Sequence, residues 1–370
     1  MRRTKLHIAR LVKFTFIVLL PFQIGFVNWA VEHPEWVEQQ YSLGFYPKMQ
    51  THLSGVSSVT AIPIGQIVFY TLLTLLVVWV VQQCRKLWLR RISVWRFLWV
   101  LVKNGLFAFS LFYGLFNLTW GLNYHRLKIP EIAQLATDDI TKEELTQISD
   151  TLARRCNELR SGIVVAEELP IFDDEILSQA MKGFQLASGH YAFIQYEQPS
   201  VKAVLVPRIM SSFRIGGIYF MFTGEANVNM DAPNFLVPAT TCHEMAHQAG
   251  FASEDEANFI SYLATQFHPD PNFQYSGNLM AFRYTMRSLY RVDSVAYQDI
   301  ADRLSAEVKS DLRKHREYWS SFDNPIDPLT DAMYDLFLKA NDQEAGIQSY
   351  SQVTSLLVGE YRRSGLNFVD

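Results

Sequence analysis

Three long apolar runs in the first third of the chain constrain its fold more than any other feature. They cover about residues 14–31, 64–81 and 98–120. Each is close to the roughly 20 apolar residues that a helix needs to cross the hydrocarbon of a bilayer. The first run lacks a small-x-small cleavage site, and two more runs follow it, so it is predicted to be an anchor rather than a cleaved signal peptide. The sequence therefore predicts a mainly α membrane protein with a membrane domain over 1–121 and the lipid bilayer as a partner.

The distribution of positive charge predicts the orientation of these spans. Lys and Arg concentrate before the first run and in the loop 82–96, whereas the loop 32–63 carries only Lys48. Because loops rich in Lys and Arg stay in the cytoplasm, we expect a cytoplasmic N-terminus. Three crossings then place residues 122–370 outside the cytoplasm. The basic residues on which this orientation depends are Arg2, Arg3, Lys5, Arg10, Lys13, Arg85, Lys86, Arg90, Arg91 and Arg96.

The remaining composition argues against two kinds of protein. The formal net charge is -4, and no basic stripe lies outside the N-terminal third, which argues against a nucleic-acid partner. The 3 cysteines cannot form a disulfide framework, and their spacing fits no thiolate metal site. Cys242 is expected to be a packing residue, because neighbours on a helix point in different directions and His243 follows it.

Residues 122–370 contain no further run long enough to span a membrane, and we expect them to form one helix-rich α+β domain with a small sheet. Thr141 and Glu144 have the spacing of a capping box that opens a helix. Apolar residues at helical spacing predict further helices, and clusters of β-branched and aromatic residues predict strands. The helices are expected near 174–187, 278–291 and 296–312, and the strands at about 201–206 and 217–222.

The strongest functional signal is a His-Glu-x-x-His motif at His243, Glu244 and His247. Residues four apart on a helix project from one face, so both imidazoles can bind one zinc ion. Glu244 lies at the position of a general base. The alternative interpretation is two solvated helix histidines beside a surface glutamate.

A catalytic zinc usually takes three protein ligands, and the third is expected just downstream. Gly250 can end the first helix in a left-handed turn, and Ser253 with Glu256 has the spacing of a capping box for a second helix. Glu254 is the predicted ligand, since Asn258 lies four residues on and can accept the ring N–H of a ligating histidine. Glu256 is the alternative third ligand.

At this point the chain resembles a known arrangement. The sequence from His243 to His247, followed by Glu254-Asp-Glu-Ala-Asn258, is similar to the gluzincin motif, with Asn258 where that motif has Asp. The chain also resembles a family of uncharacterised bacterial membrane proteins with a zinc-peptidase-like domain. The resemblance implies a zincin-like fold, one Zn²⁺ and a multi-pass protein of the bacterial cytoplasmic membrane. The stretches that carry it are WGLNYHR (120–126), FTGEANVN (222–229), HEMAHQAGFASEDEANF (243–259) and LKANDQEAGIQSYSQVTSLL (338–357).

The predicted strand at 217–222 comes shortly before the motif helix. In zinc peptidases of this general kind, an edge strand in this position pairs with an extended substrate. Tyr219, Glu225 and Asn227 are therefore candidate substrate-binding residues. The alternative is a core hairpin whose polar residues satisfy a turn.

These features predict a membrane-anchored zinc metallopeptidase that hydrolyses peptide bonds of a peptide or protein substrate, with Glu244 as the general base. The alternative is a non-catalytic, zinc-stabilised membrane receptor or scaffold. An intramembrane protease is disfavoured, because Glu254, Asp255, Glu256 and Asn258 lie close together near the motif, and such a cluster is costly inside a bilayer.

Overall fold

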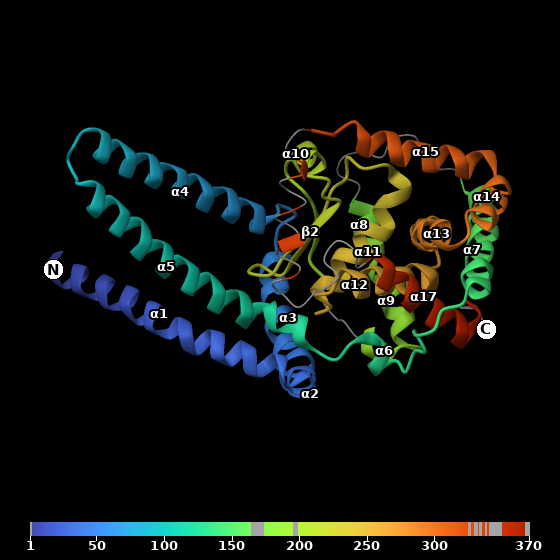
Figure 1. Cartoon of the computed structure of the whole chain (residues 1–370), viewed down its shortest axis with the longest axis horizontal. Helices are drawn as coiled ribbons and strands as arrows, with labels where there is room; N and C mark the ends of the chain where they lie inside the picture. The colour runs from blue at the N-terminus through green and yellow to red at the C-terminus, as the bar shows by residue number, and fades with distance from the viewer. Residues whose placement is uncertain are drawn as a thin grey trace. The chain divides into compact units, whose positions relative to one another are not determined.

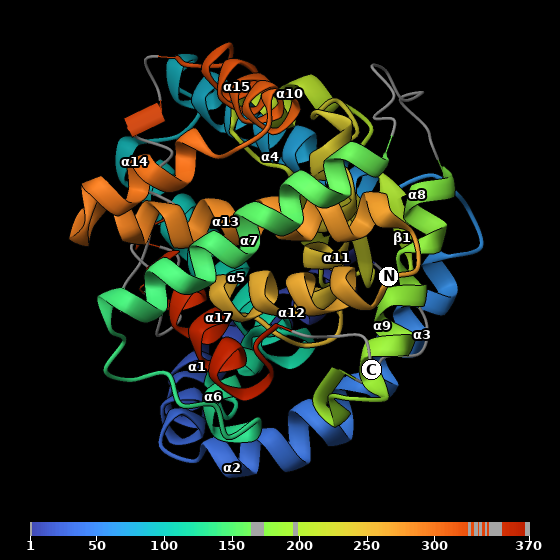
Figure 2. The same cartoon turned by 90° about the vertical axis from the view of Figure 1, so that its right-hand side faces the viewer.

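The computed structural model of the chain is mainly helical and contains one small sheet (Figures 1 and 2). It describes residues 2–163, 174–194, 199–324 and 350–366, together with positions 327, 328, 332, 335, 336 and 339. Residues 338 and 340–349 of the C-terminal stretch that carries the resemblance therefore lie outside the described residues.

The chain divides into two compact units, which interleave along the sequence. The first holds residues 1–46 and 64–126, and the second holds 47–63 and 127–370. The second half of the loop between the first two spans thus belongs to the unit that carries the motif.

The first unit contains the three predicted spans, which are confirmed as helices long and apolar enough to cross a membrane. Helices α1 and α5 pack against each other through polar side chains: Lys13 Nζ donates to Asn104 Oδ1 at 2.6 Å, and Ser110 Oγ donates to the carbonyl of Phe16. The last span begins four residues earlier than predicted, because Ser93 caps α5 by accepting from the N–H of Arg96. The elements are α1 (Arg2–Val31), α2 (Pro34–Trp36), the π-helical η1 (Val37–Phe45), α4 (Ile64–Trp88), α5 (Val94–Thr119) and η2 (Gly121–His125).

The second unit holds the remaining elements. Helix α3 (Tyr46–Ser57) lies in it from Pro47 onward. The others are α6 (Ile129–Ile132), α7 (Lys142–Gly162), α8 (Asp174–Gln179), α9 (Met181–Ser188), η3 (Ala192–Ile194), β1 (Val201–Ala203), α10 (Pro207–Ser212), β2 (Gly217–Phe220), β3 (Glu225–Val228), η4 (Asn234–Leu236), α11 (Val237–Gln248), α12 (Glu254–Phe267), α13 (Pro271–Val292), α14 (Ser294–Asp302), α15 (Ala306–Ser320) and α17 (Tyr350–Ser364).

The core of the second unit forms around α12. Its side chains are buried on all sides, which is typical of a central helix rather than an amphipathic surface helix. Phe259, Tyr262 and Leu263 are fully buried there. Helices α9, α11, α13 and α17 contact α12, and Figure 2 shows α12 enclosed by its neighbours.

The helix predictions are confirmed with changed boundaries. The predicted helix over 174–187 is two helices, α8 and α9, and the one over 278–291 begins earlier, at Pro271 of α13. The capping box of Thr141 and Glu144 opens α7 as predicted. The predicted helix over 296–312 is instead two helices, α14 and α15. The reason is local: Ser305 accepts from the N–H of Val308 and so begins a new helix.

The sheet has three strands in the order β1-β3-β2, with β1 parallel and β2 antiparallel to β3. The two predicted strands are present in shortened form. Strand β3 was not predicted, because its sequence Glu-Ala-Asn-Val lacks the β-branched and aromatic clustering of an ordinary strand. It is nevertheless buried along its whole length at the centre of the sheet.

Candidate metal centre

Helix α11 carries the two motif histidines one turn apart, on the side that faces α12. Their ring centroids are 4.6 Å apart, and the ring planes are nearly perpendicular at 87°. His247 is buried, with 6% of its surface exposed. The helix packs on the sheet through Val237, which joins Val228 of β3 in an apolar cluster. The interpretation of two solvated histidines on a surface helix therefore does not hold.

A tight turn after α11 reverses the chain. Gly250 has a φ of +94°, a left-handed conformation that favours glycine. The N–H of Gly250 donates to the carbonyl of His247, and that of Phe251 donates to the carbonyl of Ala246. This pair of bonds is the Schellman arrangement that ends helices. As a result, α12 starts at Glu254 and runs back beside α11.

The turn brings the first residue of α12 to both histidines. Glu254 Oε2 lies 3.3 Å from His243 Nε2, and Glu254 Oε1 lies 3.7 Å from His247 Nε2. One ligand atom from each of the three residues lies within 4.8 Å of the others. Among the described residues, this is the group of acidic, His and Cys side chains that could hold a metal ion.

The other ring nitrogen of each histidine faces a fixed acceptor. His243 Nδ1 lies 3.1 Å from Asn258 Oδ1, and His247 Nδ1 lies 2.8 Å from the carbonyl oxygen of Phe251. The amide of Asn258 is oriented by its Nδ2, which donates to the carbonyl of Glu254 at 2.7 Å. Both Nδ1 atoms therefore carry a proton, which leaves each Nε2, on the side of Glu254, as the atom that would bind a metal.

The pKa values of the two histidines are shifted in opposite directions. Burial lowers the pKa of His243, but its hydrogen bond and charge interaction with Glu254 outweigh burial and raise the pKa above the ordinary value. Burial and the neighbouring His243 lower the pKa of His247 to about 4. Without a metal, His243 is thus the more basic of the two histidines.

Glu244 lies beside this group with 4% of its surface exposed, and no described residue forms an ion pair with it. Burial raises the pKa of Glu244 to about 8. Strand β2 begins against this carboxylate: a Cβ added at Gly217 would lie 2.5 Å from Glu244 Oε1. Gly217 is not among the predicted site residues, although the Gly216-Gly217 pair at the start of a strand is a signal of close backbone approach.

The alternative ligand, Glu256, is engaged elsewhere. Its Oε1 accepts from the backbone N–H of Ile129 at 2.8 Å, and the residue is buried. The predicted capping box of Ser253 and Glu256 is wrong: Ser253 precedes α12, but its hydroxyl makes no cap bond and accepts from Lys128 Nζ at 3.1 Å. The Ser253 hydroxyl and the Glu256 carboxylate thus accept hydrogen bonds from residues 128 and 129 instead of capping α12. Sequence spacing could not reveal these tertiary contacts.

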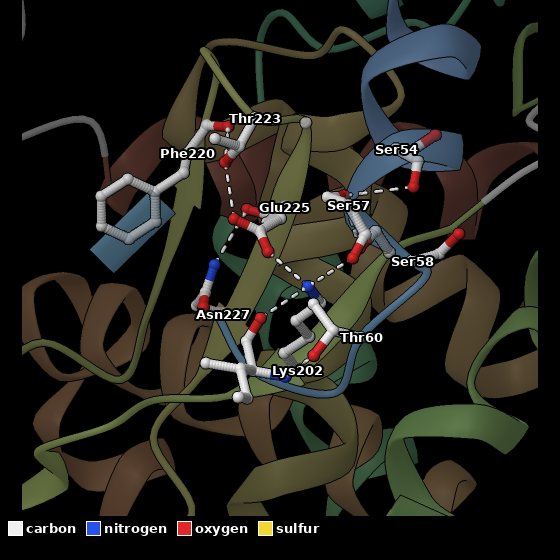
Figure 3. Close-up of polar contacts among 12 residues, drawn as sticks. Ser54, Ser57, Ser58, Thr60, Lys202, Phe220, Thr223, Glu225 and Asn227 are labelled. Carbon is white, nitrogen blue, oxygen red and sulfur yellow. Dashed lines mark hydrogen bonds and ion pairs between the residues drawn. The ribbon is translucent and has the colours of Figure 1, made fainter. Parts of the chain in front are cut away.

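The three candidate substrate residues are buried, which favours the interpretation of a core hairpin. Tyr219 donates from its hydroxyl to Gln50 Oε1 at 2.7 Å. Glu225 and Asn227 project from β3 and are fully buried. Figure 3 shows the Glu225 carboxylate between Lys202 and Thr223, at 2.5 and 2.6 Å. A substrate-binding role for these three residues stays a prediction.

The donor set fits zinc. Two neutral imidazole nitrogens and one carboxylate are ligands that zinc takes in catalytic sites. Ligand atoms at tetrahedral corners about 2.0–2.1 Å from a zinc ion lie about 3.3–3.4 Å apart, close to the 3.3 and 3.7 Å found here. Cys242 is fully buried, and burial raises the pKa of its thiol, as expected of a packing residue.

Comparisons with known proteins give a family but no activity. Residues 41–358 match the profile of a family described as "Protein of unknown function (DUF3810)". The matched residues include most of both units, without residues 1–40 and 359–370. No curated protein and no solved structure matches the chain.

Proposed function

We propose that this chain, which belongs to the DUF3810 family of proteins of unknown function, is a membrane-anchored zinc metallopeptidase with a zincin-like fold. The observation that supports this most is the convergence of His243, His247 and Glu254 beside Glu244, a buried glutamate that forms no ion pair with a described residue. Burying a carboxyl group without a hydrogen-bonding partner is costly, and a general base beside the metal would give it a function.

His243, His247 and Glu254 would hold the metal in this mechanism. Bound zinc would supply a Lewis acid that polarises the scissile carbonyl and makes water more acidic. Glu244 takes a proton from the attacking water and delivers it to the leaving amine nitrogen as the C–N bond breaks. In the metal-free site burial raises the pKa of Glu244 to about 8, and a bound divalent cation would lower it.

The edge of the sheet offers a place for the substrate backbone. Among the described residues, strand β2 pairs with β3 on one side and with no strand on the other. An extended peptide could add to its other side as a further strand. Gly217 opens β2 against Glu244, so a peptide paired there would pass beside the general base.

The location proposed for this activity is outside the cytoplasm. Its support is the charge asymmetry of the loops around the three apolar helices. A reporter enzyme fused after Asp370 tests it: activity of a periplasmic reporter is expected, and activity of a cytoplasmic reporter alone would overturn the orientation.

The experiment that tests the function measures zinc and hydrolysis on the same preparation. The full chain, in detergent or nanodiscs, is expected to hold one zinc ion and to cleave members of a peptide library. Removing the metal with a chelator should abolish cleavage, and adding zinc should restore it. Glu254→Ala should lose both properties, whereas Glu317→Ala should keep both, since its side chain is 68% exposed on α15.

The same experiment distinguishes the peptidase from the alternative, a non-catalytic receptor or scaffold. Full zinc occupancy in a well-folded protein that cleaves no library member would exclude the peptidase and leave a zinc-stabilised receptor or scaffold. Loss of zinc in Glu256→Ala together with retention in Glu254→Ala would reject the proposed ligand set.

A further inference from the structure

We propose that the end of α3 and the residues that follow it form a membrane-contact surface of the second unit. We define this surface by Val56, Val59 and Ile62, and infer that it lies in the headgroup–acyl boundary of the same bilayer that α4 spans. The inference goes beyond the proposed function and does not depend on it.

The surface consists of apolar side chains that the protein leaves uncovered. Val56, Val59 and Ile62 are 72%, 85% and 52% exposed. Residues 49–63 contain no Asp, Glu, Lys or Arg. Three exposed aliphatic side chains in an uncharged segment suit an apolar environment better than water.

Buried polar contacts hold this segment firmly to the sheet. The Lys202 ammonium of β1 donates to the carbonyls of Ser57 and Ile62 at 2.7 and 2.9 Å, and its third partner is Glu225 (Figure 3). Ser57 Oγ also donates to Ser200 Oγ at 2.9 Å. Lys202 is only 5% exposed. The segment is therefore a fixed part of the second unit rather than a loose linker.

The turn between β2 and β3 adds a second attachment. A Cβ on Gly224 would lie 2.9 Å from Leu53 Cβ and from the backbone nitrogen of Ser54, so the turn packs directly on α3. Gln50 Nε2 donates to the carbonyl of Gly224 at 3.2 Å. Helix α3 and the hairpin thus move as one body.

We infer that the bilayer covers this surface, because the surface is continuous in sequence with the membrane-spanning helix α4. Ile62 lies two residues before Ile64, the first residue of α4, whose 25 residues are apolar enough to cross a membrane. Val59 is three residues before Ile62, a separation of at most about 11 Å for an extended chain. The interfacial layer on each side of the hydrocarbon is about 5–8 Å thick. The chain is folded here rather than extended, because Lys202 Nζ bonds the carbonyls of both Ser57 and Ile62. Val59 therefore lies closer to Ile62 than this limit and within reach of that layer.

The consequence concerns the position of the sheet. Lys202 joins the carbonyl of Ile62 to β1 and, through Glu225, to β3. If Ile62 lies at the bilayer surface, this end of the sheet is held there as well.

Spin labels test the proposal in the full chain. Cys84 is exposed and is first replaced by Ser, while Cys156 and Cys242 are buried and should not react. A nitroxide is attached at Val56→Cys or Val59→Cys, and the protein is placed in phospholipid nanodiscs. Collisions with oxygen, which prefers lipid, are compared with collisions with a water-soluble nickel complex. The matched control is Val295→Cys, since Val295 of α14 is also an exposed valine, at 70%.

The expected result is that oxygen collisions exceed nickel collisions at 56 and 59, with the reverse at 295. Leu72→Cys in the middle of α4 serves as the lipid standard. Circular dichroism confirms that each labelled variant keeps its helix content. A label at either 56 or 59 that matches the water-exposed behaviour of 295 would overturn the proposal.

Discussion

Two buried glutamates on opposite faces of the small sheet have contrasting environments. Glu225 projects from β3 and meets Lys202 at 2.5 Å. Glu244 projects from α11 toward Gly217, which pairs with Val228 and so faces the other side of the sheet from Glu225. Among the described residues Glu244 forms no ion pair, and the charge interaction with His243 lowers its pKa less than burial raises it.

The contrast separates a structural carboxylate from a reactive one. A buried charge is tolerable when it is paired and hydrogen-bonded, as Glu225 is. For Glu244, burial is the largest influence and raises its pKa to about 8, against a smaller opposing effect of the neighbouring His243. Perturbed and unpaired groups of this kind occur preferentially at functional sites. A substitution of Glu244 should therefore affect hydrolysis, whereas a substitution in the Lys202–Glu225 pair should affect the free energy of unfolding.

The largest expected effect is that of Glu244→Gln on hydrolysis. The change keeps the shape of the side chain but removes the base, so kcat should fall by about 10²–10⁴-fold. Zinc content, measured by mass spectrometry, should stay at the wild-type value. Hydrolysis at the wild-type rate would exclude Glu244 from the mechanism. The contrast between a reactive Glu244 and a structural Glu225 would then not hold.

On the opposite face, Lys202→Met should act on stability. It leaves the buried Glu225 carboxylate without its cation, and the free energy of unfolding should fall by about 3–5 kcal/mol. Thermal or denaturant unfolding in detergent measures this. The double variant Lys202→Met/Glu225→Leu should recover a large part of the loss, since both charges are then gone.

The control for that loss is Arg208→Met. The side chain of Arg208 is 84% exposed, and its ion pair with Asp231 is long, at 3.9 Å. Its stability effect should be within about 0.5 kcal/mol. An equal loss from Lys202→Met and Arg208→Met would contradict the structural role of the buried pair.

Gly217→Ala probes the contact between β2 and the general base. The new methyl group would lie 2.5 Å from Glu244 Oε1, so the carboxylate must move. A displacement of about 1 Å can cost roughly 10²-fold in rate, and kcat should fall by that order. Gly216→Ala is the matched control, because its Cβ meets Thr240 Cγ2 at 3.4 Å. Equal rates in the two variants would show that the close approach is unimportant.

Asn258→Ala should weaken zinc binding without touching a ligand. The Asn258 amide accepts from His243 Nδ1 and fixes the ring. Loss of such an outer contact costs about 10–100-fold in metal affinity. Asn258→Asp should restore affinity, since its carboxylate can accept the same N–H. Competition with a fluorescent chelator measures both, and unchanged affinity in the alanine variant would exclude the positioning role.

The smallest effect is that of pH on zinc affinity. Glu254 raises the pKa of metal-free His243 above its ordinary value, so acidification protonates His243 before His247, whose pKa is about 4. Zinc must displace that proton, and affinity should fall by about tenfold for each pH unit below the pKa of His243. An affinity that does not change with acidification would show that His243 is not a ligand.

Much of the fold follows from local sequence. The three apolar runs predict the spans, and the Thr141 capping box predicts the start of α7, because these signals depend on residues near one another in the chain. Strand β3 was not predicted, because its burial depends on residues that are distant in the chain. Its residues Glu225 and Asn227 are polar, and they lie in the interior only because distant groups such as Lys202 satisfy them.

For this protein, the sequence by itself determined the motif histidines, the glycine that reverses the chain after them and the apolar segments that enter the membrane. Helical periodicity and left-handed turns are short-range properties. Only the tertiary structure decided that Glu254 rather than Glu256 faces the histidines, that Gly217 lies against Glu244, and that Lys202 binds residues 57–62 to the sheet. Each of these depends on segments brought together by burial of a common core, which no local pattern encodes.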